Sequence, residues 1–192
     1  MSVRTQYLRL LEKWTLYAVQ DIYFCPGRPD LAYYGDGTNG WGCQTNQKAL
    51  AAFAVFAMAS DLDENNVGMS RKKLLELSLS MLRYSLESHI VGSYHTTDSD
   101  TFHWGHTWIS ALGIERMMHA VMQIWDKLSP HDHALLRAML ISESDWLLDN
   151  YPVTAGLVSD NHPESNMWNG AILYHLRCVY GTHQRSHCGT AA

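Results

Sequence analysis

The sequence lacks the features by which membrane proteins and secreted proteins are recognised. It contains no apolar run of about 18 residues, the length that a membrane-spanning helix needs. Its N-terminus, MSVRTQ, has no apolar core of the kind found in signal peptides. We therefore predict a cytoplasmic protein with no membrane partner for the chain as it stands, and a secreted protein if a leader precedes it.

Charged residues are scarce as well. They make up 17% of the chain, against roughly a quarter in an average globular protein. The formal net charge is −5 and the longest basic cluster is the triplet 71–73, which argues against a nucleic-acid partner. The cysteines Cys25, Cys43, Cys178 and Cys188 show no C-x-x-C spacing, which favours reduced thiols and leaves a disulfide as the alternative.

Helical periodicity is what the sequence does contain, with almost no strand-like alternation. Six helices are predicted at residues 5–21, 44–60, 70–89, 106–128, 131–150 and 166–180. The first, third and fifth are amphipathic, with Glu143 among the outward groups of the fifth, whereas the second, fourth and sixth are mostly apolar. Ser70 and Ser129 are the predicted N-caps of the third and fifth helices.

The lengths of the connections indicate how these helices are arranged. Long connections at 22–42, 91–104 and 151–165 each lead into a mostly apolar helix, and the remaining connections are short. Antiparallel hairpins of this kind place their long loops on one face, above an inner and an outer layer of helices. The predicted fold is all-α, an α/α toroid-like array of hairpins that forms about half of a six-hairpin ring. Residues 1–180 are expected to form one domain and 181–192 an unstructured tail.

Three clusters of aromatic and polar residues lie where a long connection meets an apolar helix. Their members are Trp41, Gln44 and Asn46 in the first, His103, Trp104 and His106 in the second, and Asn161, His162, Glu164, Asn166, Trp168 and Asn169 in the third. An indole offers an apolar face and an N–H group, which suits stacking on a sugar, while amides and imidazoles bind hydroxyl groups. Core packing and helix capping are the alternative roles.

The spacing of His103 and His106 could also ligate a metal ion. No carboxylate or thiol completes the set at a recognised spacing, so we predict no metal site and no cofactor.

Four strings of residues resemble a known family. They are 104–108 (WGHTW), 113–118 (GIERMM), 144–148 (SDWLL) and, the most specific, 163–170 (PESNMWNG). They are similar to the α/α-toroid part of heparinase II/III-like proteins, which are largely lyases of uronic-acid polysaccharides, and the resemblance spans residues 41–180. In that family a complete toroid, a catalytic tyrosine and a β-sandwich domain are expected further along the chain, so the resemblance implies an incomplete fragment.

β-Elimination next to a uronate requires neutralisation of the carboxylate, a base for the α-proton and an acid for the leaving oxygen. By resemblance, Asn161 and Asn169 neutralise the carboxylate and His162 is the base. Tyr94, in a loop on the same face, is a candidate for an acid or base role. The expected partner is an acidic polysaccharide or oligosaccharide.

Two other classes of function remain open. Glycoside hydrolysis needs two carboxylates across a sugar, which Asp36, Asp98, Asp100 and Glu164 could supply from loops on that face. A non-catalytic carbohydrate-binding or assembly fragment is the other possibility. In that case the missing half-ring would leave apolar inner-helix surface exposed and promote self-association.

Overall fold

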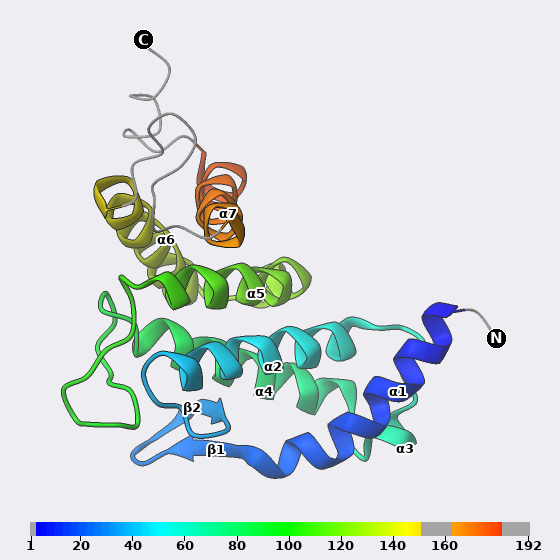
Figure 1. Cartoon of the computed structure of the whole chain (residues 1–192). Coiled ribbons are helices and arrows are strands. Elements are labelled where there is room, and N and C mark those ends of the chain that lie inside the picture. Colours follow the sequence, from blue (N-terminus) through cyan, green and yellow to red (C-terminus); the bar gives the residue numbers. More distant parts are fainter. Residues whose placement is uncertain (1–2, 151–162, 182–192) are drawn as a thin grey trace.

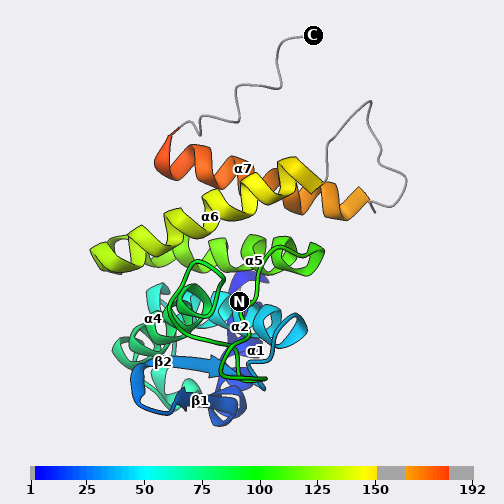
Figure 2. The same cartoon turned by 90° about the vertical axis from the view of Figure 1, so that its left-hand side faces the viewer.

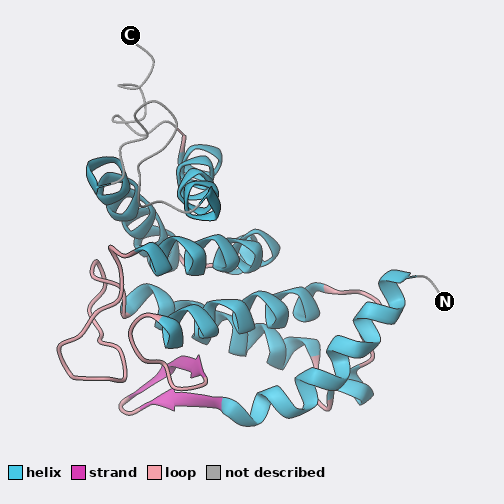
Figure 3. Cartoon of the chain, viewed as in Figure 1, coloured by secondary structure: helices cyan, strands magenta, loops and turns pink. Residues whose placement is uncertain are grey.

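The computed structural model describes residues 3–150 and 163–181, and within them it is mainly helical (Figure 3). Its α-helices are α1 (Val3–Ala18), α2 (Trp41–Met58), α3 (Glu64–Val67), α4 (Arg71–Glu87), α5 (Trp108–Ile124), α6 (Pro130–Asn150) and α7 (Pro163–Tyr180). Short 3-10 turns, η1 (Val19–Asp21) and η2 (Trp125–Lys127), extend α1 and α5. The all-α character of the prediction is confirmed, and each of the six predicted helices has a counterpart. The predicted tail lies almost entirely outside the described residues.

One part of the connection predicted at 22–42 is a β-hairpin, which corrects the expectation of a chain without strands. Strands β1 (Ile22–Cys25) and β2 (Arg28–Tyr34) pair in an antiparallel register around the turn at Pro26 and Gly27. Gly27 has φ = 71°, a value that glycine adopts at little cost. Leu31 and Ala32 are adjacent and both are fully buried, so this strand does not show the alternation by which strands are recognised.

The helices pack in successive layers (Figure 1). Helix α2 contacts α4 on one side and α5 on another, and α5 in turn contacts α7, which packs against α6. In Figure 1 α2 and α4 run across the view while α7 is seen nearly end-on, and Figure 2 shows α6 and α7 from the side. The helix axes therefore turn from the first layer to the last. The arrangement of these helices as hairpins of an α/α toroid stays a prediction.

The closest helix pair is formed by α2 and α5, which are apolar on most sides. Phe53 and Phe56 of α2 and Ile114 and Met117 of α5 are fully buried in the shared core. A Cβ atom on Gly113 would lie only 1.8 Å from Oε1 of Gln47, so the two helices approach where α5 has no side chain. Both helices begin on the same side of the molecule, next to the loop that precedes α5 (Figure 1).

The predicted N-caps are confirmed. The Ser70 hydroxyl accepts a hydrogen bond from the backbone N–H of Lys73 at 3.3 Å. The Ser129 hydroxyl accepts one from the N–H of Asp132 at 3.1 Å, and the Asp132 carboxylate accepts the Ser129 N–H at 2.9 Å. This reciprocal pair fixes the first turn of α6.

Exposed apolar side chains gather on α1 more than on the inner helices. Val3, Tyr7, Leu10 and Tyr17 all have more than half of their side-chain surface exposed, whereas α2 and α5 are buried over most of their length. The predicted self-association stays a prediction. Among the described helices, none has the combination of length and apolar character that crossing a bilayer requires.

Candidate functional site

The N-termini of α2 and α5 meet at a narrow hollow, which we call the helix-mouth site. Its polar lining is Asn39, Gln44, Gln47, Thr107 and Ser110, and its apolar lining includes Cys43, Trp104 and Ile109. The helix dipole places partial positive charge at both helix starts. Some of their first N–H groups already have partners: the Thr107 side chain caps the Ser110 N–H of α5, and the Thr38 carbonyl accepts the Cys43 N–H of α2 at 2.8 Å.

Two tryptophans lie beside this hollow. Trp41 is 60% exposed and Trp108 is 47% exposed, and their rings meet edge to face with centroids 5.8 Å apart. Exposed indoles in a fixed mutual orientation provide apolar faces on which a sugar ring can stack. Trp41 keeps the position expected from the sequence, whereas Trp108 was not among the predicted binding residues.

The structure also shows how Trp108 could have been found. Trp41 is the first residue of α2 and Trp108 is the first residue of α5, so each opens one of the two helices that line the hollow. The sequence clusters instead contained Trp104, which lies four residues before the start of α5.

The inner wall of the site consists of amide groups from α2. Gln44 and Gln47 are almost completely buried, and in the described part of the chain neither Nε2 atom has a hydrogen-bond partner. A buried donor without a partner costs about 1–3 kcal/mol. The hollow has no free volume, so an acceptor group would reach these amides only if the lining side chains moved apart. Gln44, a predicted binding residue, lines the hollow, and Gln47 joins it one helical turn later.

Two predicted binding residues have structural roles instead. Trp104 is 2% exposed and its indole N–H donates to the Ser85 carbonyl at 2.9 Å, so no ring face is free for stacking. The Asn46 carbonyl oxygen accepts the N–H of Tyr34 at 2.9 Å and its amide donates to the Ser85 hydroxyl at 3.0 Å. These bonds tie α2 to β2 and α4 and leave Asn46 unavailable to a ligand.

The two predicted histidines point toward other parts of the fold. The Nδ1 atom of His103 lies 3.3 Å from the carbonyl oxygen of His89. His106 stacks on Trp146, with centroids 5.6 Å apart, and its Nε2 atom lies 2.9 Å from the Ser142 hydroxyl. Both imidazoles therefore join the loop before α5 to its neighbours. No group of three or more potential metal ligands was found among the described residues.

Beside His106 lies a buried acid–base pair that the sequence did not indicate. His89 and Glu143 are fully buried, and the His89 Nε2 atom is 2.8 Å from Glu143 Oε1. The same oxygen accepts the backbone N–H of His106 at 2.7 Å. Glu143 is thus not an outward group, because its partners come from the C-terminal side of α4 and the loop before α5. Burial lowers the pKa of His89, and its hydrogen bond to Glu143 opposes that shift.

The third predicted cluster is described in part. Glu164 is exposed, Asn166, Trp168 and Asn169 are half-buried, and Oδ1 of Asn169 has no partner within the described residues. Trp168 packs against the core, so little of its ring is open. Asn161 and His162 lie outside the described residues.

The loop carboxylates suggested for hydrolysis mainly brace loops. Asp36 accepts the N–H and the hydroxyl of Thr38 at 3.1 and 2.9 Å, and Asp98 accepts the N–H of Asn39 at 2.6 Å. Asp100 is fully exposed and lies 3.9 Å from His95. Asp36 and Asp98 therefore shape the loop that leads into α2.

Tyr94 lies in a separate pocket of about 420 Å³, which we call the hairpin pocket. Its walls are Tyr33, Tyr94, His95, Thr97 and Asp100, and Cys25 and Pro26 complete it. No residue lines both this pocket and the helix-mouth site. The structure therefore does not group Tyr94 with the other predicted site residues.

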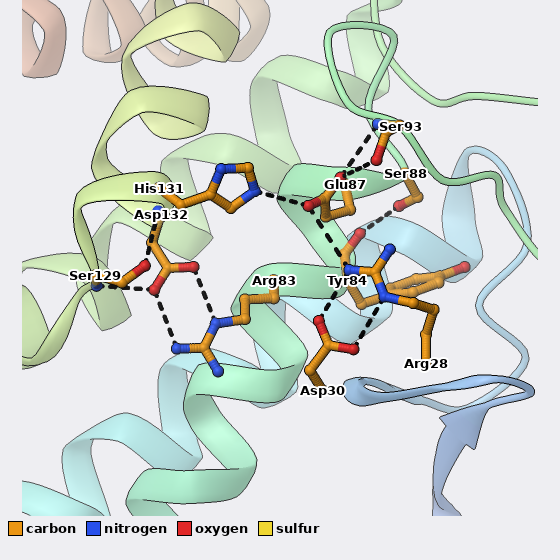
Figure 4. A network of polar contacts seen from close by, with 10 residues as sticks. All are labelled: Arg28, Asp30, Arg83, Tyr84, Glu87, Ser88, Ser93, Ser129, His131 and Asp132. Carbon is orange, nitrogen blue, oxygen red and sulfur yellow. Dashed lines mark hydrogen bonds and ion pairs between the residues drawn. The ribbon is translucent and has the colours of Figure 1, made fainter.

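A network of charged groups holds the loop that carries Tyr94 (Figure 4). Glu87, nearly buried at the end of α4, accepts the N–H and the hydroxyl of Ser93 at 3.2 and 2.8 Å. Its other oxygen lies 2.9 Å from His131 and 3.8 Å from Arg28. Burial opposes the charged form, yet the bonds from His131 and Ser93 hold the pKa of Glu87 below its usual range.

The groups at the helix-mouth site are suited to binding rather than to proton transfer. Cys43 is the titratable side chain among the lining residues, and burial raises the pKa of its thiol far above its usual range. A neutral buried thiol is neither a nucleophile nor a base at neutral pH. The described part of the site offers donors and aromatic faces, and acid–base chemistry would have to come from outside its lining.

Comparison of the chain with protein-family models, with curated proteins and with solved structures found no match.

Proposed function

We propose that the helix-mouth site binds an acidic polysaccharide. The observation that carries this proposal is the exposed pair Trp41 and Trp108 beside two buried amide donors without partners. Indole faces suit the apolar faces of sugar rings, and amide N–H groups near two helix N-termini suit carboxylate oxygens. A uronic-acid unit has both features.

The reaction that such binding would serve is β-elimination, in keeping with the resemblance to heparinase II/III-like lyases. In this proposal Asn161 and Asn169 neutralise the carboxylate, His162 removes the α-proton, and the leaving oxygen takes a proton from water as its bond to carbon breaks. The helical hairpins would then be about half of a six-hairpin α/α toroid.

Glycoside hydrolysis is the weaker candidate. It requires a pair of carboxylates facing a shared sugar, one of them free to donate a proton. Asp36 and Asp98 are already bound to loop backbone, and Asp100 belongs to the hairpin pocket.

Binding is tested by titrating the intact protein with heparin, alginate and polygalacturonate, with dextran as the neutral polymer. We expect binding to at least one acidic polymer, and a loss of roughly tenfold or more in the Trp41→Ala/Trp108→Ala variant, since stacked aromatic groups contribute about 0.5–1.5 kcal/mol each beyond buried area. Tyr17→Ala, which removes an exposed aromatic ring from α1, is the matched control. Equal affinity of the double variant and the control would contradict the proposed site.

The reaction is tested in the same samples by the ultraviolet absorbance of unsaturated uronate. We expect the absorbance to rise with time and His162→Ala to abolish the rise without loss of binding. New reducing ends without that absorbance would indicate hydrolysis instead. Binding with neither product would indicate a non-catalytic carbohydrate-binding protein.

A further inference from the structure

We propose that the hairpin pocket is a second ligand site, which takes a neutral pyranose ring rather than an acidic one. The proposal rests on the residues of this pocket and is independent of the function proposed for the helix-mouth site. At about 420 Å³ the pocket has the size of small-molecule sites, which span about 300–1,000 Å³. Tyr33 and Tyr94 give it aromatic walls, as expected where a sugar ring packs.

The polar atoms of the pocket are mostly hydrogen-bond acceptors. The Nδ1 atom of His95 lies 2.8 Å from the Thr96 carbonyl, which can only accept, so this nitrogen carries the proton. In the neutral imidazole the Nε2 atom is then an acceptor. Asp100 adds a fully exposed carboxylate 3.9 Å from that atom. A ligand that complements this arrangement must donate several hydrogen bonds, as the hydroxyl groups of a pyranose do.

Cys25, which completes the pocket, is buried, and burial raises the pKa of its thiol to about 11, so this group adds no negative charge to the pocket at physiological pH.

The charges around the pocket disfavour an anionic ligand. Asp100 stands at its edge, and Arg28, whose guanidinium lies 5.9 Å from the Tyr94 ring centroid, already forms a bidentate pair with Asp30 at 2.9 and 2.8 Å. Among the described residues that line or border the pocket, no unpaired Arg or Lys would offset the repulsion between Asp100 and a ligand carboxylate. The two sites thus have opposite preferences, since the helix-mouth site offers donors.

The pocket is held in shape without a ligand. The Glu87 carboxylate accepts hydrogen bonds from the N–H and the hydroxyl of Ser93 (Figure 4). The Glu87 carbonyl accepts the Tyr94 N–H at 2.8 Å. His95 stacks on Tyr94 with centroids 4.3 Å apart. On the other wall, Tyr33 and Thr97 pack against Gly37, where a Cβ would lie 2.7 and 2.9 Å from them. A pre-formed pocket loses little entropy when a ligand enters.

The test uses the intact protein at pH 8 with methyl β-glucopyranoside, methyl β-galactopyranoside and methyl β-glucuronide, followed by ligand-observed NMR and calorimetry. We expect a neutral glycoside to bind and the glucuronide to bind at least roughly tenfold more weakly at low salt, where like-charge repulsion is least screened. Asp100→Ala and His95→Phe should each weaken binding of the neutral glycoside by roughly tenfold, the loss expected for one hydrogen bond to a charged or well-placed group. His95→Phe preserves the stacking on Tyr94.

Asp126→Ala, which removes an exposed carboxylate from η2, is the matched control and should leave binding unchanged. The proposal is overturned if no neutral glycoside binds at tens of millimolar, if the glucuronide binds as tightly, or if Asp100→Ala and His95→Phe behave like the control. Because the polysaccharide experiment depends on Trp41 and Trp108, either proposal can fail while the other stands.

Discussion

At the scale of single residues, Glu143 organises the loop between α4 and α5. Its Oε1 atom receives two hydrogen bonds, one from the imidazole of His89 and one from the backbone of His106. The N–H of Val91 points to the His89 Nδ1 atom at 3.3 Å, so in the neutral ring the proton is on Nε2 and is donated to Glu143. His106 itself has φ = 54°, a conformation that is costly outside glycine and is held here by these contacts.

Glu143→Ala should therefore destabilise the protein by about 2–4 kcal/mol, because two buried donors would lose their acceptor. Glu143→Gln is the matched control: it keeps an oxygen at the same place and should cost clearly less. Urea unfolding followed by circular dichroism measures both. A Glu143→Ala variant as stable as Glu143→Gln would show that these hydrogen bonds do not hold the loop.

Residue roles were predicted well where they depend on near neighbours in the chain. Ser70 and Ser129 were identified as N-caps because their partners are three residues away. Glu143 was assigned to the solvent face because a carboxylate on an amphipathic helix normally lies there. Its partner His89 is 54 residues distant, and no local pattern reveals such a pair.

At the scale of elements, the contact between α2 and α5 shapes the helix-mouth site. Gly113 allows the two helices to approach where the Gln47 side chain would otherwise meet a Cβ at 1.8 Å. The same contact holds Gln47 against the hollow. The approach of the two helix N-termini and the position of the amide donors therefore depend on the absence of a Cβ atom at Gly113.

We expect Gly113→Ala to destabilise the protein by about 1–3 kcal/mol, because overpacking at a buried contact outweighs the roughly 1 kcal/mol that alanine gains over glycine in a helix. It should also weaken polysaccharide binding, since Gln47 must move. Gly170→Ala in α7 is the matched control: a Cβ there meets nothing within 4 Å, so stability should rise by about 0.5–1 kcal/mol. Thermal unfolding of the two variants tests this, and a stabilised Gly113→Ala would contradict it.

At this scale the helices were predicted from sequence and the β-hairpin was not. Most of the predicted helices have a 3.6-residue apolar period or a continuous apolar run, and the fifth has clear start signals at Ser129 and Pro130. The strands β1 and β2 are short, and β2 includes Pro29, which sequence reasoning treats as unfavourable in a strand. The Pro26-Gly27 turn between two aromatic stretches was the available signal.

At the scale of the whole molecule, buried ionisable groups tie separate elements together. Asp132 at the start of α6 is 1% exposed. Its two carboxylate oxygens accept hydrogen bonds from the guanidinium of Arg83 on α4 at 3.0 and 3.1 Å (Figure 4). Burial works against its charge, yet the bonds from Arg83 and Ser129 hold the pKa of Asp132 below its usual range. The pKa values of Glu12 and Glu87 are lowered in the same way, although burial opposes the shift in each.

These shifts predict a loss of stability on acidification in two stages. The pKa of His89 is lowered by folding, so the unfolded chain binds more protons and stability falls as the pH drops below about 6.5. The carboxylates also have lower pKa values when folded. Their contribution is present above about pH 4 and is lost as the pH falls through their folded values.

The measurement is the free energy of unfolding in urea between pH 8 and pH 3. Asp132→Asn should be less stable than the wild type at pH 7 and should lose less between pH 5 and pH 3, while its change between pH 8 and pH 6 stays the same. Parallel curves for the two proteins across the acid range would show that Asp132 does not carry a shifted pKa.

The sequence by itself determined the helical class, the limits of most helices and their caps, because each follows from residues within a few positions of one another. It also indicated that long loops precede the apolar helices, and the N-termini of α2 and α5 do meet. Tertiary structure alone decided which side chains reach the site. It buried Trp104 and Asn46, brought Trp108 beside Trp41, and separated Tyr94 into a pocket of its own. Those outcomes depend on partners that are distant in sequence, and only packing of the whole chain brings them together.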